Sequence, residues 1–232
     1  MMTGSFLTGR EPQRVTLAST SADSLFSPGE QRFLLRGADW QTYQAISEAL
    51  RGRHVRLTYD RGNLEFMTIS HAHGNLSRLL ARLVVVLTEE FQLPVRSCGD
   101  MTCEKQDLDR GLEPDECFYL AHEPQIRGRD EIDLAVDPPP DLAIEIDISR
   151  SSRNRLPIYA AMGVPEVWRF DGTTLTFYRL QGNGSYAAAE ASGCFPAIAP
   201  GVVSEYLLHR HEQDENALVR SFRERVRTLK SS

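Results

Sequence analysis

Two carboxylates stand two residues apart in an otherwise apolar run of the sequence. Glu145 and Asp147 belong to LAIEIDI, residues 142–148. Residues i and i+2 of a strand point to the same side, so both carboxylates share one face with Ala143, and the larger apolar residues share the other. Two such carboxylates repel each other and are costly to bury. Either the strand is an edge strand with a wet face, or a divalent cation offsets the repulsion.

A third carboxylate favours the metal interpretation. Asp115 follows Pro114 and precedes another short apolar run, ECFYL. One acid on a strand and an acid-x-acid on a later strand can converge at the end of a sheet. Mg²⁺ and Mn²⁺ accept such oxygen ligands and keep bound water for attack. We therefore expect Asp115 and Glu145 on neighbouring strands, close enough to share one metal ion with Asp147, and raising each other's pKa chiefly by like-charge repulsion.

The elements that must position these acids can be read from the periodicity of the sequence. Asp39 to Leu50 predicts an amphipathic helix, and His71 to Gln92 predicts a longer one. Between them, two alternating runs flank residues 60–63, DRGN, which predicts a hairpin.

The rest of the chain alternates between predicted strands and helices. Strands are expected over residues 95–103, 115–120, 142–148, 167–170, 175–180 and 186–190, and helices over 150–162 and 214–229. Pro157 is tolerable only near the first turn of its helix. This order predicts a mixed α/β layer fold, of the α+β kind, with an N-terminal hairpin.

The length of 232 residues suits one large domain. We expect a loosely ordered arm over residues 1–30, one domain over 31–210 and a helical tail over 211–232. The four cysteines form no metal-binding pattern and are expected to be buried small residues in a reducing compartment. No apolar run is long enough to span a bilayer and the N-terminus is polar, so we expect the cytoplasm.

The formal net charge of −6 means that a nucleic-acid binder would need a local basic face. The tail run RSFRERVRTLK could contact phosphate, although a solvated helix face explains it better. The sequence contains no GxxxxGK[ST] loop, no GxGxxG motif after a strand and no GxSxG elbow, which argues against P-loop, dinucleotide-binding and α/β-hydrolase chemistry.

Three segments resemble one known family. PDECFYL, PPPDLAIEIDISRSS and RLPIYAAMGVPEVWRFDG are similar to the Uma2 family, also called DUF820 and described as putative restriction endonucleases. The resemblance extends from about Leu34 to Tyr206. It implies the restriction endonuclease-like PD-(D/E)XK fold, a mixed central sheet flanked by helices, and a metal-dependent endonuclease that hydrolyses DNA. A homodimer is expected by the same analogy.

The resemblance also assigns roles to residues. Pro114-Asp115 matches the PD element, and Glu145 matches the second acid. Asp147 stands where the usual lysine follows that acid. In many members the lysine comes from the following helix, and Arg155 stands there in this chain. Arginine keeps the charge but cannot act as a base near neutral pH.

Weaker candidates lie in the N-terminal half. Family members commonly show an acid and a histidine in the region of Glu65 and His73. Glu65 would join the metal ligands. We interpret His73 as a polar residue at a helix start, and Trp40 and Trp168 as core residues.

Two functional hypotheses remain open at this stage. In the first, Asp115, Glu145 and Asp147 or Glu65 hold the metal, and Arg155 holds the phosphate. In the second, the chain is a catalytically weakened nuclease-fold protein that binds nucleic acid or protein. The retained acids favour the first, and Arg155 with the acidic net charge favours the second.

Overall fold

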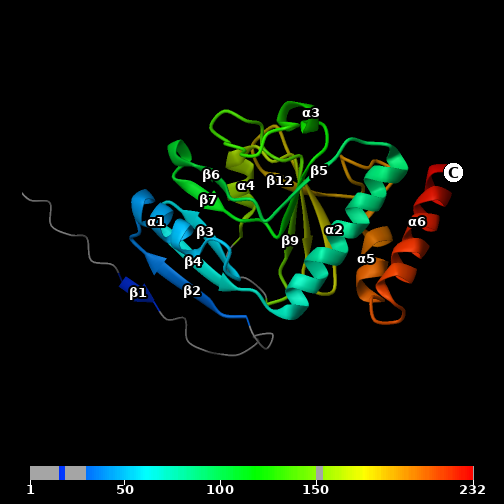
Figure 1. The fold of residues 1–232 in the computed structure, drawn as a ribbon, viewed down its shortest axis with the longest axis horizontal. Coiled ribbons are helices and arrows are strands. Elements are labelled where there is room, and N and C mark those ends of the chain that lie inside the picture. Colours follow the sequence, from blue (N-terminus) through cyan, green and yellow to red (C-terminus); the bar gives the residue numbers. More distant parts are fainter. Residues whose placement is uncertain (1–15, 19–29, 150–153, 232) are drawn as a thin grey trace, which may run out of the picture.

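The computed structural model describes residues 16–18, 30–149 and 154–231. These residues form two six-stranded sheets with helices packed around the second one (Figure 1). The first sheet is antiparallel, with the order β1-β2-β4-β3-β7-β6. Its strands are β1 (Thr16–Ala18), β2 (Arg32–Arg36), β3 (Val55–Asp60), β4 (Asn63–Thr68), β6 (Cys103–Lys105) and β7 (Arg110–Leu112).

The second sheet is mixed and has the order β12-β11-β10-β9-β8-β5. Strands β9 and β10 are parallel, and its other neighbours are antiparallel. Its strands are β5 (Arg96–Gly99), β8 (Glu116–Tyr119), β9 (Leu142–Ile146), β10 (Glu166–Phe170), β11 (Leu175–Leu180) and β12 (Tyr186–Ala189). This is the mixed central sheet that the sequence predicted.

The helices lie mainly around this second sheet. They are α1 (Trp40–Leu50), α2 (His71–Phe91), α3 (Glu123–Ile126), α4 (Leu156–Met162), α5 (Pro200–Leu208) and α6 (Glu215–Ser231), with a 3₁₀ turn at Gln106–Leu108. The helix α2 runs across one face of the sheet, and α5 and α6 lie beside it (Figure 1). Apolar side chains of all three helices join those of β8 to β11 in one core, while α4 packs on the opposite face.

The alternation of the acid-bearing strand is confirmed. Leu142, Ile144 and Ile146 of β9 lie in the core beneath α2, and Ala143 lies on the other face with residues of α4. Because β9 has β8 on one side and β10 on the other, the interpretation of an edge strand with a wet face is wrong. Glu145 and Asp147 therefore point from a central strand toward a covered face.

The hairpin and the helix starts follow local chemistry. Arg61 and Gly62, between β3 and β4, both have positive φ, as the favoured two-residue hairpin turn requires. Ser70 accepts a hydrogen bond from the His73 backbone N–H and caps α2. The helix expected over residues 150–162 begins later, at Leu156, with Pro157 in its first turn. Residues 150–153 lie outside the described part of the chain.

The tail helix is part of the packed structure. Leu218, Val219, Phe222 and Val226 of α6 are buried in the core cluster beside α2. Arg223 forms ion pairs with Glu89 at 2.6 Å and Glu90 at 2.9 Å. All four cysteines are free thiols, with Cys103 and Cys117 fully buried. No helix among the described residues is long and apolar enough to cross a membrane.

Candidate active site

Asp115 and Glu145 lie on neighbouring strands, as predicted. Strands β8 and β9 pair antiparallel with Glu116 opposite Ile144. Just before β8, the backbone N–H of Asp115 donates to the carbonyl of Ile144 at 3.1 Å. The Asp115 carboxylate accepts from the Ile146 backbone N–H at 2.7 Å. The main chain thus fixes Asp115 beside Glu145, and both side chains are more than nine-tenths buried.

Glu145 is held by two side chains at the start of α4. Arg155 donates from Nη1 to Oε2 at 2.9 Å, and the Tyr159 hydroxyl donates to Oε1. Arg155 and Tyr159 are four residues apart, so they reach the same carboxylate from one side of the helix start. Arg155 thus forms a buried ion pair with Glu145. The second terminal nitrogen of Arg155, Nη2, is buried and has no hydrogen-bond partner among the described residues.

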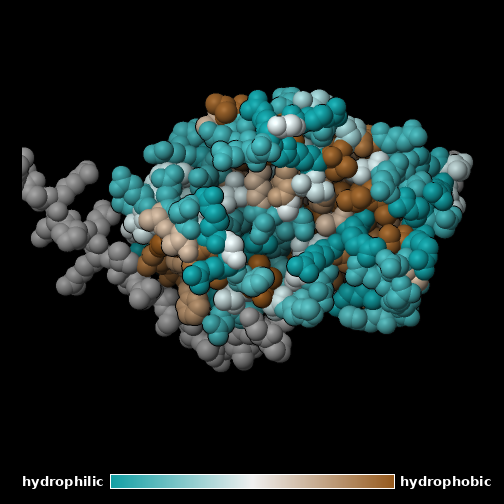
Figure 2. Space-filling model, viewed as in Figure 1, coloured by the Kyte–Doolittle hydropathy of each residue, from teal (hydrophilic) through white to brown (hydrophobic). Residues whose placement is uncertain are grey.

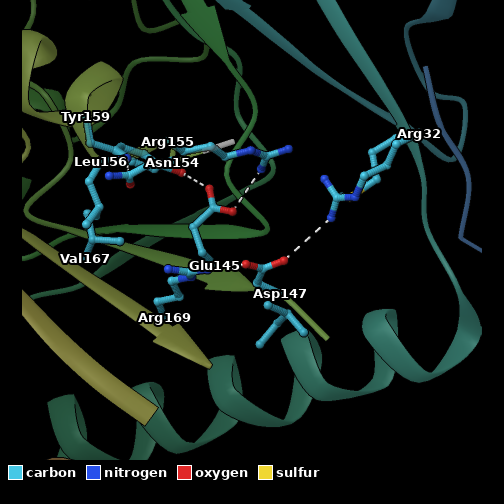
Figure 3. A pocket seen from close by; sticks show the side chains of 11 residues that line it. Arg32, Glu145, Asp147, Asn154, Arg155, Leu156, Tyr159, Val167 and Arg169 are labelled. Carbon is cyan, nitrogen blue, oxygen red and sulfur yellow. Dashed lines mark hydrogen bonds and ion pairs between the residues drawn. The ribbon is translucent and has the colours of Figure 1, made fainter. Parts of the chain in front are cut away.

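Asp147 faces two other arginines (Figure 3). Arg169 of β10 forms an ion pair with Oδ2, and Arg32 of β2 lies 3.8 Å from Oδ1. Arg32 also pairs with Glu65 of β4 at 3.2 Å and donates to the Ser149 hydroxyl at 2.9 Å. Arg32 therefore links the first sheet to the end of β9 and stands between Glu65 and Asp147.

Asp115 has a different partner, His73 of α2. His73 Nε2 lies 2.7 Å from Asp115 Oδ1, and its Nδ1 lies 3.1 Å from Glu30 Oε1. Arg56 of β3 places its Nε 3.8 Å from the same Asp115 oxygen. His73 lies in the first turn of α2, as interpreted from the sequence, but it is only 1% exposed. It is a buried bridge between two carboxylates.

The two central acids have pKa values shifted in opposite directions. Burial raises the pKa of Glu145, with a further rise from the Asp115 charge, although the Arg155 charge opposes both. Burial would also raise the pKa of Asp115, but the His73 hydrogen bond and charge outweigh it and leave the pKa lowered. The expected mutual rise through like-charge repulsion is thus wrong for Asp115, and for Glu145 burial is the larger cause.

The basic partners remain charged. Burial lowers the pKa of His73, but hydrogen bonds to Asp115 and Glu30 raise it further, to about 9. Burial also opposes the charge of Arg155, and the neighbouring Glu145 more than compensates and raises its pKa. Near neutral pH, each buried acid of the site therefore has a cationic neighbour.

Two spaces border these side chains. A cavity of about 30 Å³ is lined by Glu145, Asp147, Arg155, Tyr159 and Arg169 among others, which leaves room for about one or two water molecules. A larger groove of about 430 Å³ is lined by Asp115 and His73. No group of three or more His, Cys, Asp or Glu within the described residues has the geometry of a metal site. The chemistry of the donors, carboxylates on adjacent strands, is nevertheless that preferred by Mg²⁺ and Mn²⁺.

Sequence reasoning missed several groups around these acids, including Tyr159, Arg169 and Arg32, and Glu30, which pairs with His73. Tyr159 stands one helical turn after Arg155, a spacing that could have signalled a shared target. Arg169 stands opposite Glu145 in the register of β9 and β10, which requires knowledge of the parallel pairing. Arg32 and Glu30 precede or begin a strand that the sequence analysis did not predict, so nothing local placed them at the site.

Known proteins resemble this chain over most of its length. The model of the Uma2 family, described as "Putative restriction endonuclease", matches residues 40–200. Among solved structures, the chain is similar to "a putative nuclease belonging to DUF820 from Anabaena variabilis ATCC 29413". The two are 18% identical with a TM-score of 0.45, covering 66% of this chain and 91% of the other. No curated protein matches the sequence.

Proposed function

Because the chain belongs to the Uma2 family, we propose that it is a nuclease that hydrolyses DNA phosphodiester bonds with the help of a divalent metal ion. The observation that carries this proposal is that two buried acids, Asp115 and Glu145, lie side by side at adjacent strands. Arg155 binds Glu145, and its Nη2 has no hydrogen-bond partner among the described residues. A buried guanidinium group that retains a free donor is suited to a phosphate oxygen.

Each residue has a part in this chemistry. Asp115 and Glu145 would hold Mg²⁺ or Mn²⁺, and the ion would supply a bound water of lowered pKa. Asp147 is paired with Arg169 and lies near Arg32, so it would help to orient these groups. Tyr159 orients the Glu145 carboxylate through its hydroxyl. Arg155 contacts a phosphate oxygen through Nη2 and stabilises the charge that develops there. Glu65 acts indirectly, because it holds Arg32 beside Asp147.

Arg155 limits what this site can do with protons. A guanidinium group remains charged at all ordinary pH values and cannot serve as a general base. Activation of water therefore rests on the carboxylates and the metal ion. We accordingly propose that Arg155 replaces the usual lysine as a charge stabiliser.

A plasmid cleavage assay tests the proposal. Wild-type protein should nick or linearise plasmid DNA with Mg²⁺ or Mn²⁺ and should do neither in EDTA. Glu145→Ala should abolish cleavage. Glu145→Gln keeps an oxygen near Tyr159 and should be equally inactive with less disturbance of the fold. Glu48→Ala, which alters an exposed carboxylate on α1, should cleave like wild type.

Absence of cleavage under all these conditions would favour the second function, a weakened nuclease-fold protein that binds nucleic acid or protein. That function is supported by the occupation of both Glu145 oxygens by protein donors. Calorimetric titration with Mn²⁺ separates the two functions. A site able to work as a nuclease should bind Mn²⁺ and lose that binding in Glu145→Gln, whereas a decayed site should bind none.

A further inference from the structure

A polar groove lies beside Asp115, on the side of the site away from Glu145's small cavity. It is bounded by residues 51–54 after α1, by the first turns of α2 and by residues 99–102 after β5. Its volume is about 430 Å³. Figure 2, in the view of Figure 1, shows mainly hydrophilic residues between α1 and the first turns of α2. The groove reaches Asp115, and exposed residues such as Arg53 and Arg78 line it.

Charges in this groove are arranged by depth. Exposed cationic side chains stand around its mouth, and buried or half-buried acids line its base. The cationic group comprises Arg51, Arg53 and Arg78, with Arg56 deeper in the groove. The acids at the base are Glu113, Asp115 and Glu116, while Asp100 is the one exposed acid that lines it.

Not all of the mouth cations pair with an acid. Arg51 pairs with Glu48, and Arg56 pairs with Asp100, each at 2.5 Å. For Arg53 and Arg78, no ion pair is found among the described residues. Unpaired exposed cations close to buried acids are suited to a ligand that carries repeated negative charge.

The other basic segment of the sequence is less available. In the tail helix α6, Arg223 and Arg227 pair with Glu89 or Glu90 of α2, and Lys230 donates to the Glu90 carbonyl. These contacts occupy basic groups that the sequence suggested for phosphate. The local basic face required of this acidic protein is therefore better supplied by the groove.

The opposite approach to the acids is closed. The cavity beside Glu145 has only about 30 Å³, and Arg32 and Arg169 close on Asp147 from its two sides. A DNA strand cannot enter from this side, because the cavity holds only one or two water molecules. Asp115 lines the larger groove, so a phosphate can reach the acids from that side.

We propose that this groove is the binding surface for duplex DNA, with Arg53 and Arg78 contacting backbone phosphates on either side of the one presented to Asp115. The identity of the ligand as DNA rests on the proposed function. Binding of DNA in the groove does not require that the protein cleave it. Contacts to phosphate position a duplex without reading its sequence. Binding through the groove should therefore be salt-dependent and tolerant of sequence.

The test is DNA binding without any divalent metal, measured by fluorescence anisotropy of a labelled duplex at increasing NaCl. The variant Arg53→Glu/Arg78→Glu reverses two exposed charges at the mouth. The matched control is Arg220→Glu/Arg225→Glu, which makes the same charge change at exposed positions of α6. The groove variant should bind at least about tenfold more weakly, and its log–log salt slope should shrink by about 2. The control should retain most of the wild-type affinity and its slope.

Cleavage by the same proteins separates this inference from the proposed function. If wild type cleaves, the groove variant should raise KM with little change in kcat. If the groove and control variants lose the same amount of DNA binding, the groove is not the binding surface. The same holds if the groove variant binds DNA as tightly as wild type, even when cleavage is intact. If only the groove variant loses DNA binding and wild type cuts no DNA, the groove is supported as the binding surface and the proposed nuclease activity is contradicted. If the wild-type protein binds no duplex DNA, the proposed binding surface is wrong.

Discussion

Asp115 and Glu145 are neighbours on adjacent strands of one sheet, yet the molecule surrounds them in opposite ways. Glu145 faces a cavity of only about 30 Å³ and is held by Arg155 and Tyr159 at the start of α4. Asp115 borders an open groove and is held by His73 of α2. The pKa of Glu145 is raised, and that of Asp115 is lowered. The same chemical group in the same sheet thus ionises differently, because burial prevails at Glu145 and the contact with His73 prevails at Asp115.

This difference divides the work of the site. A carboxylate with a lowered pKa keeps its charge and is ready to hold a cation. The raised pKa of Glu145 reflects the cost of burial, which Arg155 offsets in the absence of metal. We call the surroundings of Glu145, with the small cavity, the closed half of the site, and the surroundings of Asp115, with the larger groove, the open half. We propose that the closed half holds the phosphate-binding Arg155 and that the substrate enters through the open half.

The closed half should be the more sensitive to loss of a charge. Glu145→Ala leaves the buried guanidinium of Arg155 without its carboxylate partner, which typically costs about 3–5 kcal/mol of unfolding free energy. Glu48→Ala removes an equally close but exposed partner of Arg51 and should cost at most about 1 kcal/mol. Urea unfolding of metal-free protein measures both. Equal stability of the two variants would show that the Arg155–Glu145 pair is not part of a closed, desolvated cluster.

The open half should respond to pH through His73. Its pKa is raised from 6.5 to about 9 in the folded protein. The folded state therefore binds a proton more tightly than the unfolded state, and this stabilisation is complete below pH 6.5. It is lost as pH rises through about 9, at a rate of at most about 1.4 kcal/mol per pH unit.

Urea unfolding at pH 6 and at pH 9.5 measures the contribution of His73. The loss between these pH values should be smaller in His73→Gln than in wild type. His71→Gln, at an exposed position of the same helical turn, should behave like wild type. If all three proteins show the same pH dependence of stability, protonation of His73 does not stabilise the open half.

How far the sequence predicts these two halves depends on the range of the interactions. The alternation of β9 and the hairpin of β3 and β4 are local patterns, and both were predictable. The contact between Arg155 and Glu145 spans only ten residues and was also predictable. The partners of Asp115 and Asp147 lie farther away in sequence. His73 lies more than forty residues before Asp115, and Arg32 belongs to a strand of the other sheet.

The ends of helices and the shortest strands were predicted less well than the long elements. A helix from Arg150 would place Pro157 beyond the first turn, where its ring clashes with the preceding turn. The structure instead begins α4 at Leu156 and leaves Arg155 immediately before the helix. The short strands β6 and β7 have three residues each, too few for alternation to be recognised.

A divalent metal would join the two halves, so its binding should depend on both acids. Metal-free protein should gain thermal stability on addition of Mg²⁺, by about 2.7 kcal/mol when the free ion is at a hundred times its Kd. Asp115→Asn and Glu145→Gln should each lose this gain. A melting temperature unchanged up to millimolar Mg²⁺ would contradict a preformed site. A gain that persists in one variant would show that only one half binds the ion.

The smallest expected effect concerns Arg155, which connects the halves through its unpartnered nitrogen. Nη1 donates to Glu145, and Nη2 has no hydrogen-bond partner within residues 30–149 and 154–231, so one guanidinium group can hold the carboxylate and a phosphate oxygen together. Arg155→Ala should lower cleavage by about tenfold or more, because it removes a charge stabiliser. Arg155→Lys should keep or raise cleavage, since an ammonium group retains the charge. Arg223→Ala, which changes an arginine on α6, serves as the control for general effects on the enzyme. Wild-type cleavage by both Arg155 variants would show that this arginine only neutralises Glu145. The closed half would then contribute structure to the site and no chemistry.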